Sequence, residues 1–266
     1  MNKLISILVV CLNPGKKIIT TLDSIKAQSF KNYEVIVKDG ASSDGTLERL
    51  NNYEGLDISV ISQKDSGIYD AMNQAVSYAT GKYVYFLNCG DSLYDSEVLA
   101  KIAEADDDTD SLIIYGNIYE MKTSSHVCQN PVIDGFACYR NVPCHQACFY
   151  NTELVKAHPF DINYKVRADY EQFLWCYFKG GTRFKYIDTT VASYEGDGYS
   201  ESKVGAKLSA DEHKIITQKY MAPKDIRRYK TKLLLTLAPL RRALAHNRLT
   251  AKMYNGIKNT VYGKKR

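Results

Sequence analysis

The sequence of 266 residues contains no apolar run long enough to cross a membrane. A membrane-spanning helix needs about 18 to 20 consecutive apolar residues, whereas the apolar stretch near the start runs only from Leu4 to Leu12. No small-residue cleavage site follows this stretch, so we interpret it as a first strand and not as a signal peptide. We accordingly expect a cytoplasmic protein.

The cysteines show no recognisable spacing pattern. The seven cysteines form no C-x-x-C pair and no cluster with histidine, so the sequence shows neither a zinc pattern nor a disulfide framework. An odd number of dispersed cysteines is typical of reduced thiols in the cytosol.

Three common site motifs are absent as well. There is no G-x-x-x-x-G-K-[ST] run, which excludes a P-loop, and no G-x-G-x-x-G after the first apolar stretch. A dinucleotide fold of the dehydrogenase type is therefore not expected. The G-x-S-x-G elbow of serine hydrolases does not occur either.

Acidic residues are nearly absent from the C-terminal segment. The whole chain has a net charge of +5, but residues 224–266 hold 13 Lys and Arg against the single acid Asp225. This segment thus carries +12 and the rest of the chain −7. A mildly acidic body with a strongly basic tail suits a partner of negative charge, such as membrane lipid, nucleic acid or an acidic protein.

The basic tail alternates cationic clusters with leucines and contains Pro239, which predicts a kinked or split amphipathic helix. A solvated helical face is the plain interpretation. We favour peripheral attachment to the inner face of the membrane, where anionic lipid attracts each Lys or Arg by about 1 kcal/mol. Nucleic acid is not expected as a partner, because the basic charge lies outside the folded body.

The first half of the chain alternates short β-branched runs with helical periodicity, which predicts right-handed βαβ units and a mostly parallel, Rossmann-like sheet flanked by helices. Gly81 is predicted to cap the third helix. The expected strands are 4–11, 33–38, 58–61 and 83–87, and the expected helices are 18–27, a helix from about 47, and one over 71–79.

The second half is less regular. A stretch of mixed character over 124–140 predicts a loop with edge strands, and the clearest helix begins at Asp169 and ends before Gly180. The other expected elements are helices over 98–105 and 203–220, strands over 111–115, 147–150, 184–187 and 191–194, and a loop over 197–200.

Four successive strands of the predicted sheet end on polar residues, namely Asn13, Asp39, Asp65 and Asp91. Each residue alone is more often a helix cap or a turn residue than a ligand. On one rim of a parallel sheet, however, three carboxylates form an acidic pocket that needs a cation or hydrogen-bond donors to compensate it. We therefore expect a ligand rich in hydroxyls and amides, together with a metal ion.

Several blocks of the sequence resemble family 2 glycosyltransferases, and the likeness extends over about residues 4 to 200. The order and spacing of these blocks are more specific than any single short motif. They are VVCLN (9–13), TLDSI (21–25), YEVIVKDGASSDGT (33–46), KDSGIYDAMN (64–73) and FLNCGD (86–91).

This resemblance implies a GT-A fold and the transfer of a sugar, with inversion, from a nucleotide sugar. The domain would span 1–222, with a nucleotide-sugar half (1–110) and an acceptor half (111–222), followed by the basic helical tail 223–266. A UDP-sugar is the default donor, and a glycan or lipid-linked saccharide is the implied acceptor. The setting would be the assembly of bacterial surface polysaccharides.

The resemblance also implies roles for individual residues. Asp39 would contact the base of the nucleotide, with the Asn13-Pro14 turn beside it. Asp91 matches the last carboxylate of the family's metal motif and would bind Mn²⁺ or Mg²⁺. The implied nucleotide- and donor-binding residues are Asn13, Pro14, Asp39, Asp65, Asn73, Asn88 and His145.

In two places the sequence departs from the family. Asn88 and Gly90 stand where the metal motif commonly has further acids, so Asp91 alone supplies a charge. Because Mg²⁺ and Mn²⁺ are held by one or two carboxylates plus phosphate oxygens and water, we expect the metal and the nucleotide diphosphate to bind together. Ala168 replaces the first acid of the pair that begins the helix near 169.

The second acid of that pair, Asp169, is the implied general base. A carboxylate at a helix N-terminus is stabilised as the anion; the plain alternative is that Asp169 only caps its helix, and Glu171 is the reserve base. The pair His145-Gln146 matches a family position facing the pocket, although a single histidine is more often structural. The loop 197–200 resembles one that closes over the donor.

Two other functions fit parts of the pattern. A nucleotidyltransferase could use a related sheet, but it needs a basic glycine-rich loop after the first strand, and Asn13 to Lys17 is only a faint version. A non-catalytic binding module with a basic tail is the second alternative.

Overall fold

The computed structural model describes residues 3–107, 112–196 and 203–235, and it divides the chain into two compact units, 1–216 and 217–266. The boundary lies inside a helix, ahead of the division at 222 that the sequence predicts. The predicted loop 197–200 and Pro239 lie outside the described residues. Within the described ranges, no helix has the length and apolar character that crossing a bilayer requires.

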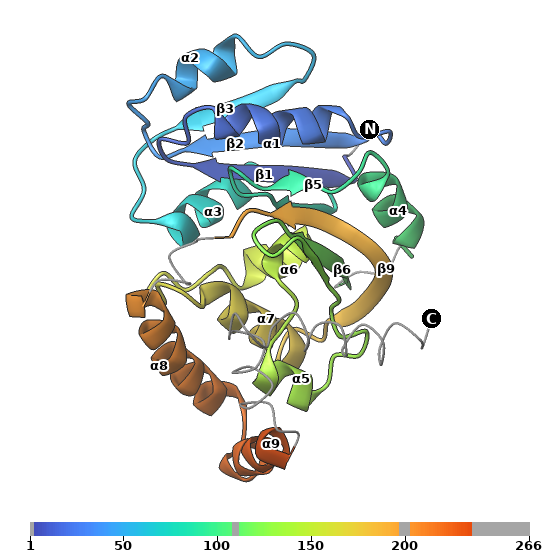
Figure 1. Cartoon of the computed structure of the whole chain (residues 1–266), viewed down its shortest axis with the longest axis vertical. Helices are drawn as coiled ribbons and strands as arrows, with labels where there is room; N and C mark the ends of the chain where they lie inside the picture. Colours follow the sequence, from blue (N-terminus) through green and yellow to red (C-terminus); the bar gives the residue numbers. More distant parts are fainter. Residues whose placement is uncertain (1–2, 108–111, 197–202, 236–266) are drawn as a thin grey trace. The chain divides into compact units, whose positions relative to one another are not determined.

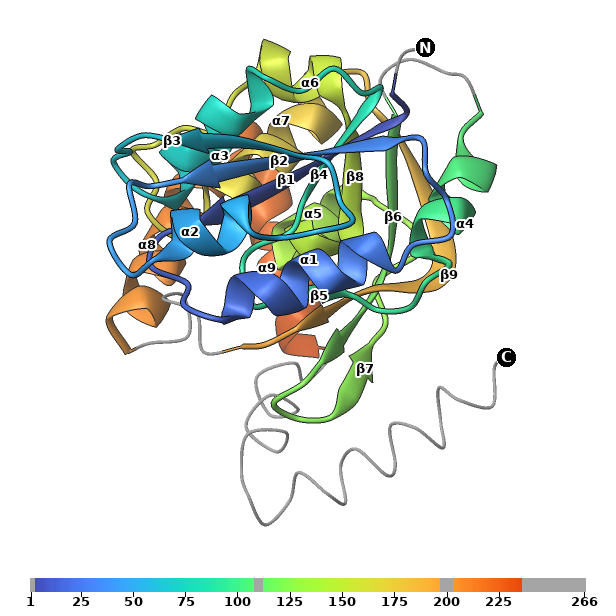
Figure 2. The same ribbon diagram turned by 90° about the horizontal axis from the view of Figure 1, so that it is seen from above.

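The first half of the chain forms four parallel strands in the order β3-β2-β1-β4 (Figures 1 and 2). This confirms the predicted alternation of strands and helices. The elements are β1 (Ile5–Cys11), α1 (Lys17–Lys26), β2 (Tyr33–Asp39), α2 (Thr46–Asn51), β3 (Ile58–Ser62), α3 (Ile68–Val76) and β4 (Tyr83–Phe86).

The same sheet continues through the second half, so the two predicted halves share one structural layer. Strand β8 (Cys148–Asn151) runs antiparallel beside β4, and the order then continues β6-β9-β5. Here β6 is Leu112–Glu120, β9 is Arg183–Tyr194 and β5 is Ser92–Leu93, while β7 (Ser125–Val127) pairs with β6. The two strands expected over 184–194 form one continuous strand, β9.

The stretch 124–140, predicted as a loop with edge strands, contains β7 and also a short helix, α5 (Gly135–Arg140). Asp134 accepts a hydrogen bond from the backbone N–H of Ala137 and so caps α5. The remaining elements are α4 (Val98–Ala105), the 3₁₀ helix η1 (His145–Ala147), α6 (Thr152–Ala157), α7 (Ala168–Phe178), α8 (Lys203–Tyr220) and α9 (Pro223–Leu235).

Helices cover both faces of the sheet, and the side chains of β1 contribute to the apolar core on each face. These side chains alternate, with Ile5, Ile7 and Val9 in one apolar cluster and Leu8 and Val10 in the other. The first cluster includes residues of α1 and α4, and the second includes residues of α3, α6 and α7 (Figure 2). A strand buried on both faces reads as a continuous apolar run, which is why β1 was recognisable from the sequence.

The predicted role of Gly81 as a helix cap is wrong. Helix α3 ends at Val76 with Ser77 as its C-cap. The backbone N–H of Gly81 instead donates to Ser6 Oγ at 2.9 Å, and a Cβ on Gly81 would lie 2.7 Å from the backbone nitrogen of Ser6. Only glycine fits here, because the backbone of Ser6 lies too close for a side chain. In the sequence, such a glycine cannot be told from one that ends a helix.

A fully buried ammonium group, Lys38 of β2, fixes the loop that follows β3. Its Nζ donates to Gln63 O at 2.6 Å, to Asp65 Oδ2 at 3.0 Å and to Asp39 O at 3.1 Å. All three donors of the ammonium group are therefore used, which makes its burial tolerable.

The substitution Lys38→Met should destabilise the protein by about 3 to 5 kcal/mol, because it leaves the Asp65 carboxylate and two carbonyl groups without their donor. Unfolding in urea measures this loss. Lys64→Met, at an exposed neighbouring position, is the matched control and should change the stability by less than about 0.5 kcal/mol. Equal effects of the two variants would contradict the role assigned to Lys38.

Candidate active site

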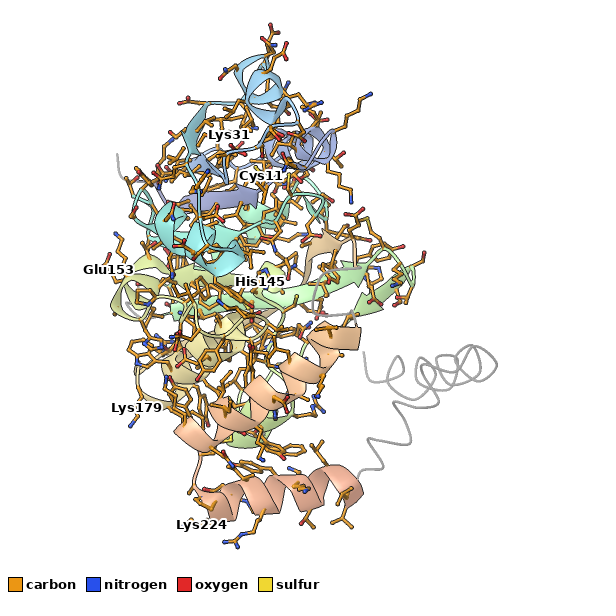
Figure 3. All side chains as sticks on the ribbon, turned by 90° about the vertical axis from the view of Figure 1, so that its left-hand side faces the viewer. Cys11, Lys31, His145, Glu153, Lys179 and Lys224 are labelled. Carbon is orange, nitrogen blue, oxygen red and sulfur yellow. The ribbon has the colours of Figure 1, made fainter. Side chains whose placement is uncertain are left out.

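A cavity of about 610 Å³ lies in the first unit and is lined by residues from both sequence halves. It brings together four of the residues predicted from the sequence: Asn88, Asp91, His145 and Asp169. Figure 3 shows His145 inside the mass of side chains, whereas Glu153 and Lys179 point outward. The other lining residues are Lys17, Ile68, Tyr69, Cys89, Cys144, Gln146, Lys165, Val166, Tyr194, Glu195 and Gly196.

Asp91 occupies the turn that follows β4, at the carboxyl end of the parallel strands. Its Oδ2 accepts a hydrogen bond from Gln146 Nε2 at 3.1 Å, and its Oδ1 accepts one from the backbone N–H of Glu195 at 3.0 Å. Only 4% of the residue is exposed. Burial raises the pKa of Asp91 above its ordinary value, because these two donors and the nearby His145 do not fully offset the desolvation.

Gly90 gives this turn its shape. Its φ is +102°, a conformation that other residues rarely adopt, and its N–H donates to Thr21 Oγ1. A Cβ at this position would lie 2.7 Å from Glu195 Oε2. The conformation of the backbone at this position therefore explains why glycine stands where the family motif commonly has an acid.

Asn88 and His145 connect this turn to the second half of the chain. The Asn88 amide nitrogen lies 3.2 Å from His145 Nε2. Because the amide is the donor, Nε2 is the acceptor and the ring proton resides on Nδ1. The amide oxygen of Asn88 is buried and has no hydrogen-bond partner, although the residue lines the cavity.

Asp169 lies in the first turn of α7 and is held by three donors. Oδ2 is 3.2 Å from His145 Nδ1, while Oδ1 accepts from the Tyr69 hydroxyl at 3.0 Å and from the backbone N–H of Tyr170 at 2.9 Å. The Asp169 side chain keeps 26% exposure. One lone pair on Oδ2 remains for a ligand, since each carboxylate oxygen can accept two hydrogen bonds.

The electrostatic balance at Asp169 is opposite to that at Asp91. Desolvation would raise the pKa of Asp169, but the hydrogen bonds from His145, from the Tyr69 hydroxyl and from the backbone N–H of Tyr170 outweigh it, and the pKa is lowered. Asp169 is therefore a carboxylate at neutral pH, as a group that accepts a proton must be.

The residues around Asp91 fit a divalent cation that arrives with its ligand. Within the described ranges there is no group of three or more His, Cys, Asp or Glu that could hold a metal by itself. Asp91 and the unpaired amide oxygen of Asn88 are hard oxygen donors of the kind Mg²⁺ and Mn²⁺ prefer. They leave most coordination positions to be filled by water or phosphate.

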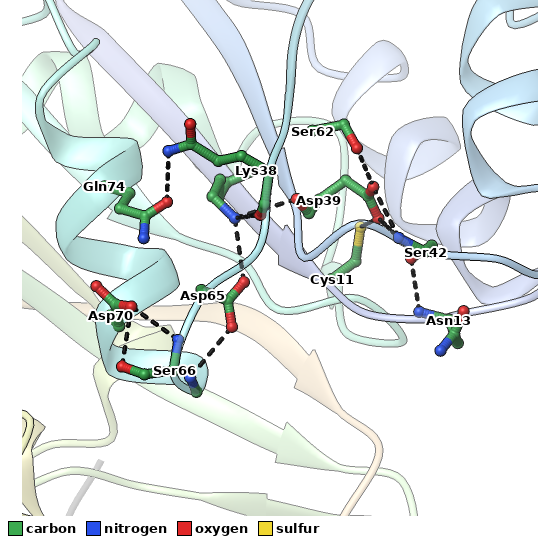
Figure 4. Close-up of polar contacts among 12 residues, drawn as sticks. Cys11, Asn13, Lys38, Asp39, Ser42, Ser62, Asp65, Ser66, Asp70 and Gln74 are labelled. Carbon is green, nitrogen blue, oxygen red and sulfur yellow. Dashed lines mark hydrogen bonds and ion pairs between the residues drawn. The ribbon is translucent and has the colours of Figure 1, made fainter.

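Asp39 does not line the cavity and is fully buried at the end of β2 (Figure 4). Its carboxylate accepts hydrogen bonds from the backbone N–H of Ser42 and from the Ser62 hydroxyl at 2.6 Å. Burial raises its pKa, the two serines lower it more, and the net pKa lies below the ordinary value. Its contact with a nucleotide base stays a prediction.

The Asn13-Pro14 turn lies next to Asp39 through Ser42. The Asn13 N–H donates to Ser42 Oγ at 2.7 Å, and its side-chain oxygen accepts from the N–H of Ser43 at 2.8 Å. The exposed Asn13 has φ of +48°. These bonds shape the loops beyond β1 and β2 without placing Asn13 or Pro14 in the cavity.

Asp65 and Asn73 also lie outside the cavity lining. Asp65 forms the ion pair with Lys38 at 3.0 Å. Asn73 exchanges two hydrogen bonds with the backbone of Phe160, at 2.8 and 2.9 Å. Both side chains thus have structural partners, and donor binding by either one stays a prediction.

Sequence reasoning assigned no role to several residues of the cavity, among them Lys17, Tyr69 and Glu195. Lys17 Nζ pairs with the Glu195 carboxylate at 2.6 Å across 178 positions of the chain. Tyr69 lies inside a block that resembles the family, and this position was the only indication of it in the sequence. Nothing in the local sequence marks Lys17 or Glu195.

Comparisons of sequence are consistent with this geometry. The family model described as Glycosyl transferase family 2 matches residues 6–189. A PGL/p-HBAD biosynthesis glycosyltransferase of Mycobacterium tuberculosis is 32% identical over 198 residues, which cover 73% of this chain and 77% of that protein.

Solved structures show the same fold at lower identity. TarS 1–349 of S. aureus in complex with UDP is 22% identical with a TM-score of 0.60; the match covers 73% of this chain and 60% of that one, so this chain spans about three-fifths of its length. The mannosyltransferase PcManGT of Pyrobaculum calidifontis, in complex with GDP-Man and Mn²⁺, is 18% identical with a TM-score of 0.66, covering 98% and 81%. The chain therefore belongs to glycosyl transferase family 2 and is a glycosyltransferase with the GT-A fold.

Proposed function

We propose that this enzyme transfers a sugar, with inversion, from a nucleotide-diphosphate sugar to a hydroxyl group of a glycan or lipid-linked acceptor. The observation that carries the proposal is that Asp91 and Asp169 line one cavity, in which His145 connects Asp169 to Asn88. A UDP-sugar is the default donor. Among the structural neighbours, TarS is described with UDP and PcManGT with GDP-Man and Mn²⁺.

Asp169 acts as the general base in this proposal. The acceptor hydroxyl donates its proton to the remaining lone pair of Oδ2 as its oxygen attacks the anomeric carbon. The bond from that carbon to the diphosphate oxygen breaks on the opposite face, and the nucleotide diphosphate leaves with the bonding electrons. Inversion follows from this single displacement, through an oxocarbenium-like transition state as in glycoside hydrolysis.

Asp91 marks the end of the cavity where the leaving group belongs. Its carboxylate and the Asn88 amide oxygen would hold Mn²⁺ or Mg²⁺, which neutralises charge on the departing diphosphate when bound. Gln146 and the Glu195 backbone orient Asp91 and leave one lone pair on each of its oxygens.

Membership of the family decides against a nucleotidyltransferase and a non-catalytic binding module. A screen of nucleotide sugars for released nucleoside diphosphate, followed by mass spectrometry of the product, would identify donor and acceptor.

Asp169→Asn should reduce transfer by about 10²- to 10⁴-fold, because the amide cannot accept the acceptor's proton. Release of nucleoside diphosphate in the presence of acceptor measures turnover, and calorimetry with UDP measures donor-site binding, which should be unchanged. Asp57→Asn, at an exposed position outside the cavity lining, is the control and should retain full activity. Substantial turnover by Asp169→Asn would assign the base elsewhere, first to Glu171.

Mn²⁺ should bind at least about 10-fold more tightly when UDP is present, because one carboxylate and one amide leave most coordination positions to phosphate oxygens. Calorimetric titration of Mn²⁺ with and without UDP tests this coupling. Asp91→Asn should remove the gain produced by UDP. Equal Mn²⁺ affinity in both titrations of the wild-type enzyme would contradict a shared site.

The tail is proposed to hold the enzyme on anionic membrane at the cytoplasmic face. Helix α9 contains five Lys and Arg residues and one acidic residue, and none of its residues is buried. The full chain should co-sediment with phosphatidylserine vesicles in low salt and much less in high salt. A chain ending at Met221 should stay in the supernatant; equal sedimentation of both chains would remove the membrane proposal.

A further inference from the structure

Glu212 of α8 is a buried carboxylate that no step of the proposed reaction uses. The residue is 5% exposed. Its Oε1 accepts from the backbone N–H of Lys165 at 2.7 Å, and its Oε2 accepts from the N–H groups of Val166 and Arg167 at 3.1 and 2.9 Å. Three successive amides of one segment thus converge on one carboxylate from a distant helix.

The segment 165–167 leads directly into α7, the helix that carries Asp169. Arg167 is the N-cap residue of α7, and its own side chain makes no capping hydrogen bond. Helix N-termini present unpaired N–H groups and positive potential, which a carboxylate satisfies. Glu212 therefore supplies from α8 the side-chain acceptor that the N-cap residue Arg167 does not provide.

One peptide group connects Glu212 to Asp169. The N–H of Arg167 is bonded to Glu212, while the carbonyl of the same peptide group, Val166 O, accepts from the Tyr69 hydroxyl at 2.8 Å. That hydroxyl also lies 3.0 Å from Asp169 Oδ1. Hydrogen bonds on the two sides of one peptide group strengthen each other. A shift of Glu212 should therefore move this peptide group, and with it the Tyr69 hydroxyl and Asp169.

Further contacts on the same face of α8 hold this arrangement. Arg167 Nε donates to the backbone oxygen and the hydroxyl of Ser209, both at 2.8 Å. His213 Nε2 lies 2.8 Å from Tyr139 O, and its ring stacks on Tyr170 with centroids 5.2 Å apart. Ser209, Glu212 and His213 are spaced as neighbours on one helix face.

We propose that Glu212 is a positioning residue for the reaction: it sets the start of α7 so that Asp169 meets the acceptor hydroxyl. The inference rests on the proposed role of Asp169 as general base. Helix α8 begins beyond residue 189, where the match to the family model ends. The positioning group thus comes from a part of the chain that the family model does not describe.

Glu212→Gln tests the inference, because the side chain keeps its size but one amide-facing oxygen becomes an NH₂ donor. The kcat should fall about 10- to 100-fold, since a misplacement of about 1 Å can cost about 100-fold, while the KM for the donor stays within about 2-fold. Asp211→Asn, one residue away on an exposed position of α8, removes the same charge and should leave kcat unchanged. Unchanged kcat in Glu212→Gln, or an equal loss in Asp211→Asn, would overturn the proposal.

A double-mutant cycle with Tyr69→Phe separates positioning from general stability. If Glu212 acts through the peptide group that Tyr69 also holds, Glu212→Gln should lower kcat less in the Tyr69→Phe background than in the wild type. Losses that multiply independently would overturn the proposal. Thermal unfolding of all four proteins, with kcat measured at least 15 °C below the lowest midpoint, keeps an unfolded fraction from imitating a loss of kcat.

Hydrogen–deuterium exchange makes the test independent of turnover. The peptide that covers residues 165–170 should exchange faster in Glu212→Gln than in the wild type, and the peptides of β1 and β2 should not change. Unchanged exchange over 165–170 would overturn the proposal. A wild-type enzyme that releases no nucleoside diphosphate from any donor would instead overturn the proposed function.

Discussion

The hydrogen bond between His145 Nδ1 and Asp169 Oδ2 joins the two sides of the site, and the sheet order makes it feasible. Strand β8 runs antiparallel to β4, with Tyr85 opposite Phe149. The start of β8 therefore lies at the carboxyl end of β4, and η1, which precedes β8, is brought beside the turn that holds Asp91. The Tyr85 hydroxyl donates to Gln146 O at 3.0 Å and fixes η1 there. Without this reversal of strand direction, His145 could not contact Asn88 and Asp169 together.

The two carboxylates of the cavity are driven to opposite behaviour by their surroundings. Asp91 is nearly excluded from solvent and its pKa is raised, so a cation that replaces the lost solvation would be bound favourably. Asp169 is surrounded by donors and its pKa is lowered. Sites that assign different tasks to similar acids commonly separate their pKa values in this way. The separation supports charge compensation at Asp91 and proton acceptance at Asp169.

The sequence predicted the parts of the fold that depend on local pattern. Strand β1 is apolar on both faces, and α4 has a clear helical period, so both were found close to their observed bounds. Asp91 was singled out by its place at a strand end, whereas Asp169 was assigned by the resemblance of residues 168–170 to the family's acidic pair at a helix start. Gly81 was misassigned because a glycine that admits the backbone of a neighbouring strand looks like one that ends a helix.

Contacts between distant segments account for what could not be predicted. Asn73 lies in a block that resembles the family, yet its side chain is bonded to the backbone of Phe160, 87 positions away. Glu195 reaches Asp91 across 104 positions through a backbone N–H, which no residue type could reveal. Hydrogen bonds between such distant residues form only when the whole sheet has assembled. Hydrophobic periodicity over a few residues cannot predict them.

The hydrogen bonds at Asp169 also limit how an acceptor can approach. Tyr69 and the backbone of Tyr170 occupy both lone pairs of Oδ1, and His145 occupies one of Oδ2. Only the second lone pair of Oδ2 is left, so in the proposed reaction the attacking hydroxyl comes to that atom. The other ring nitrogen of His145 is bonded to Asn88, three positions before Asp91, so a chain of hydrogen bonds runs from Asp169 through His145 to Asn88. The proposed inversion requires the anomeric carbon to lie between the hydroxyl bonded to Oδ2 and the diphosphate at Asp91, so that attack and departure occur on opposite faces of the sugar.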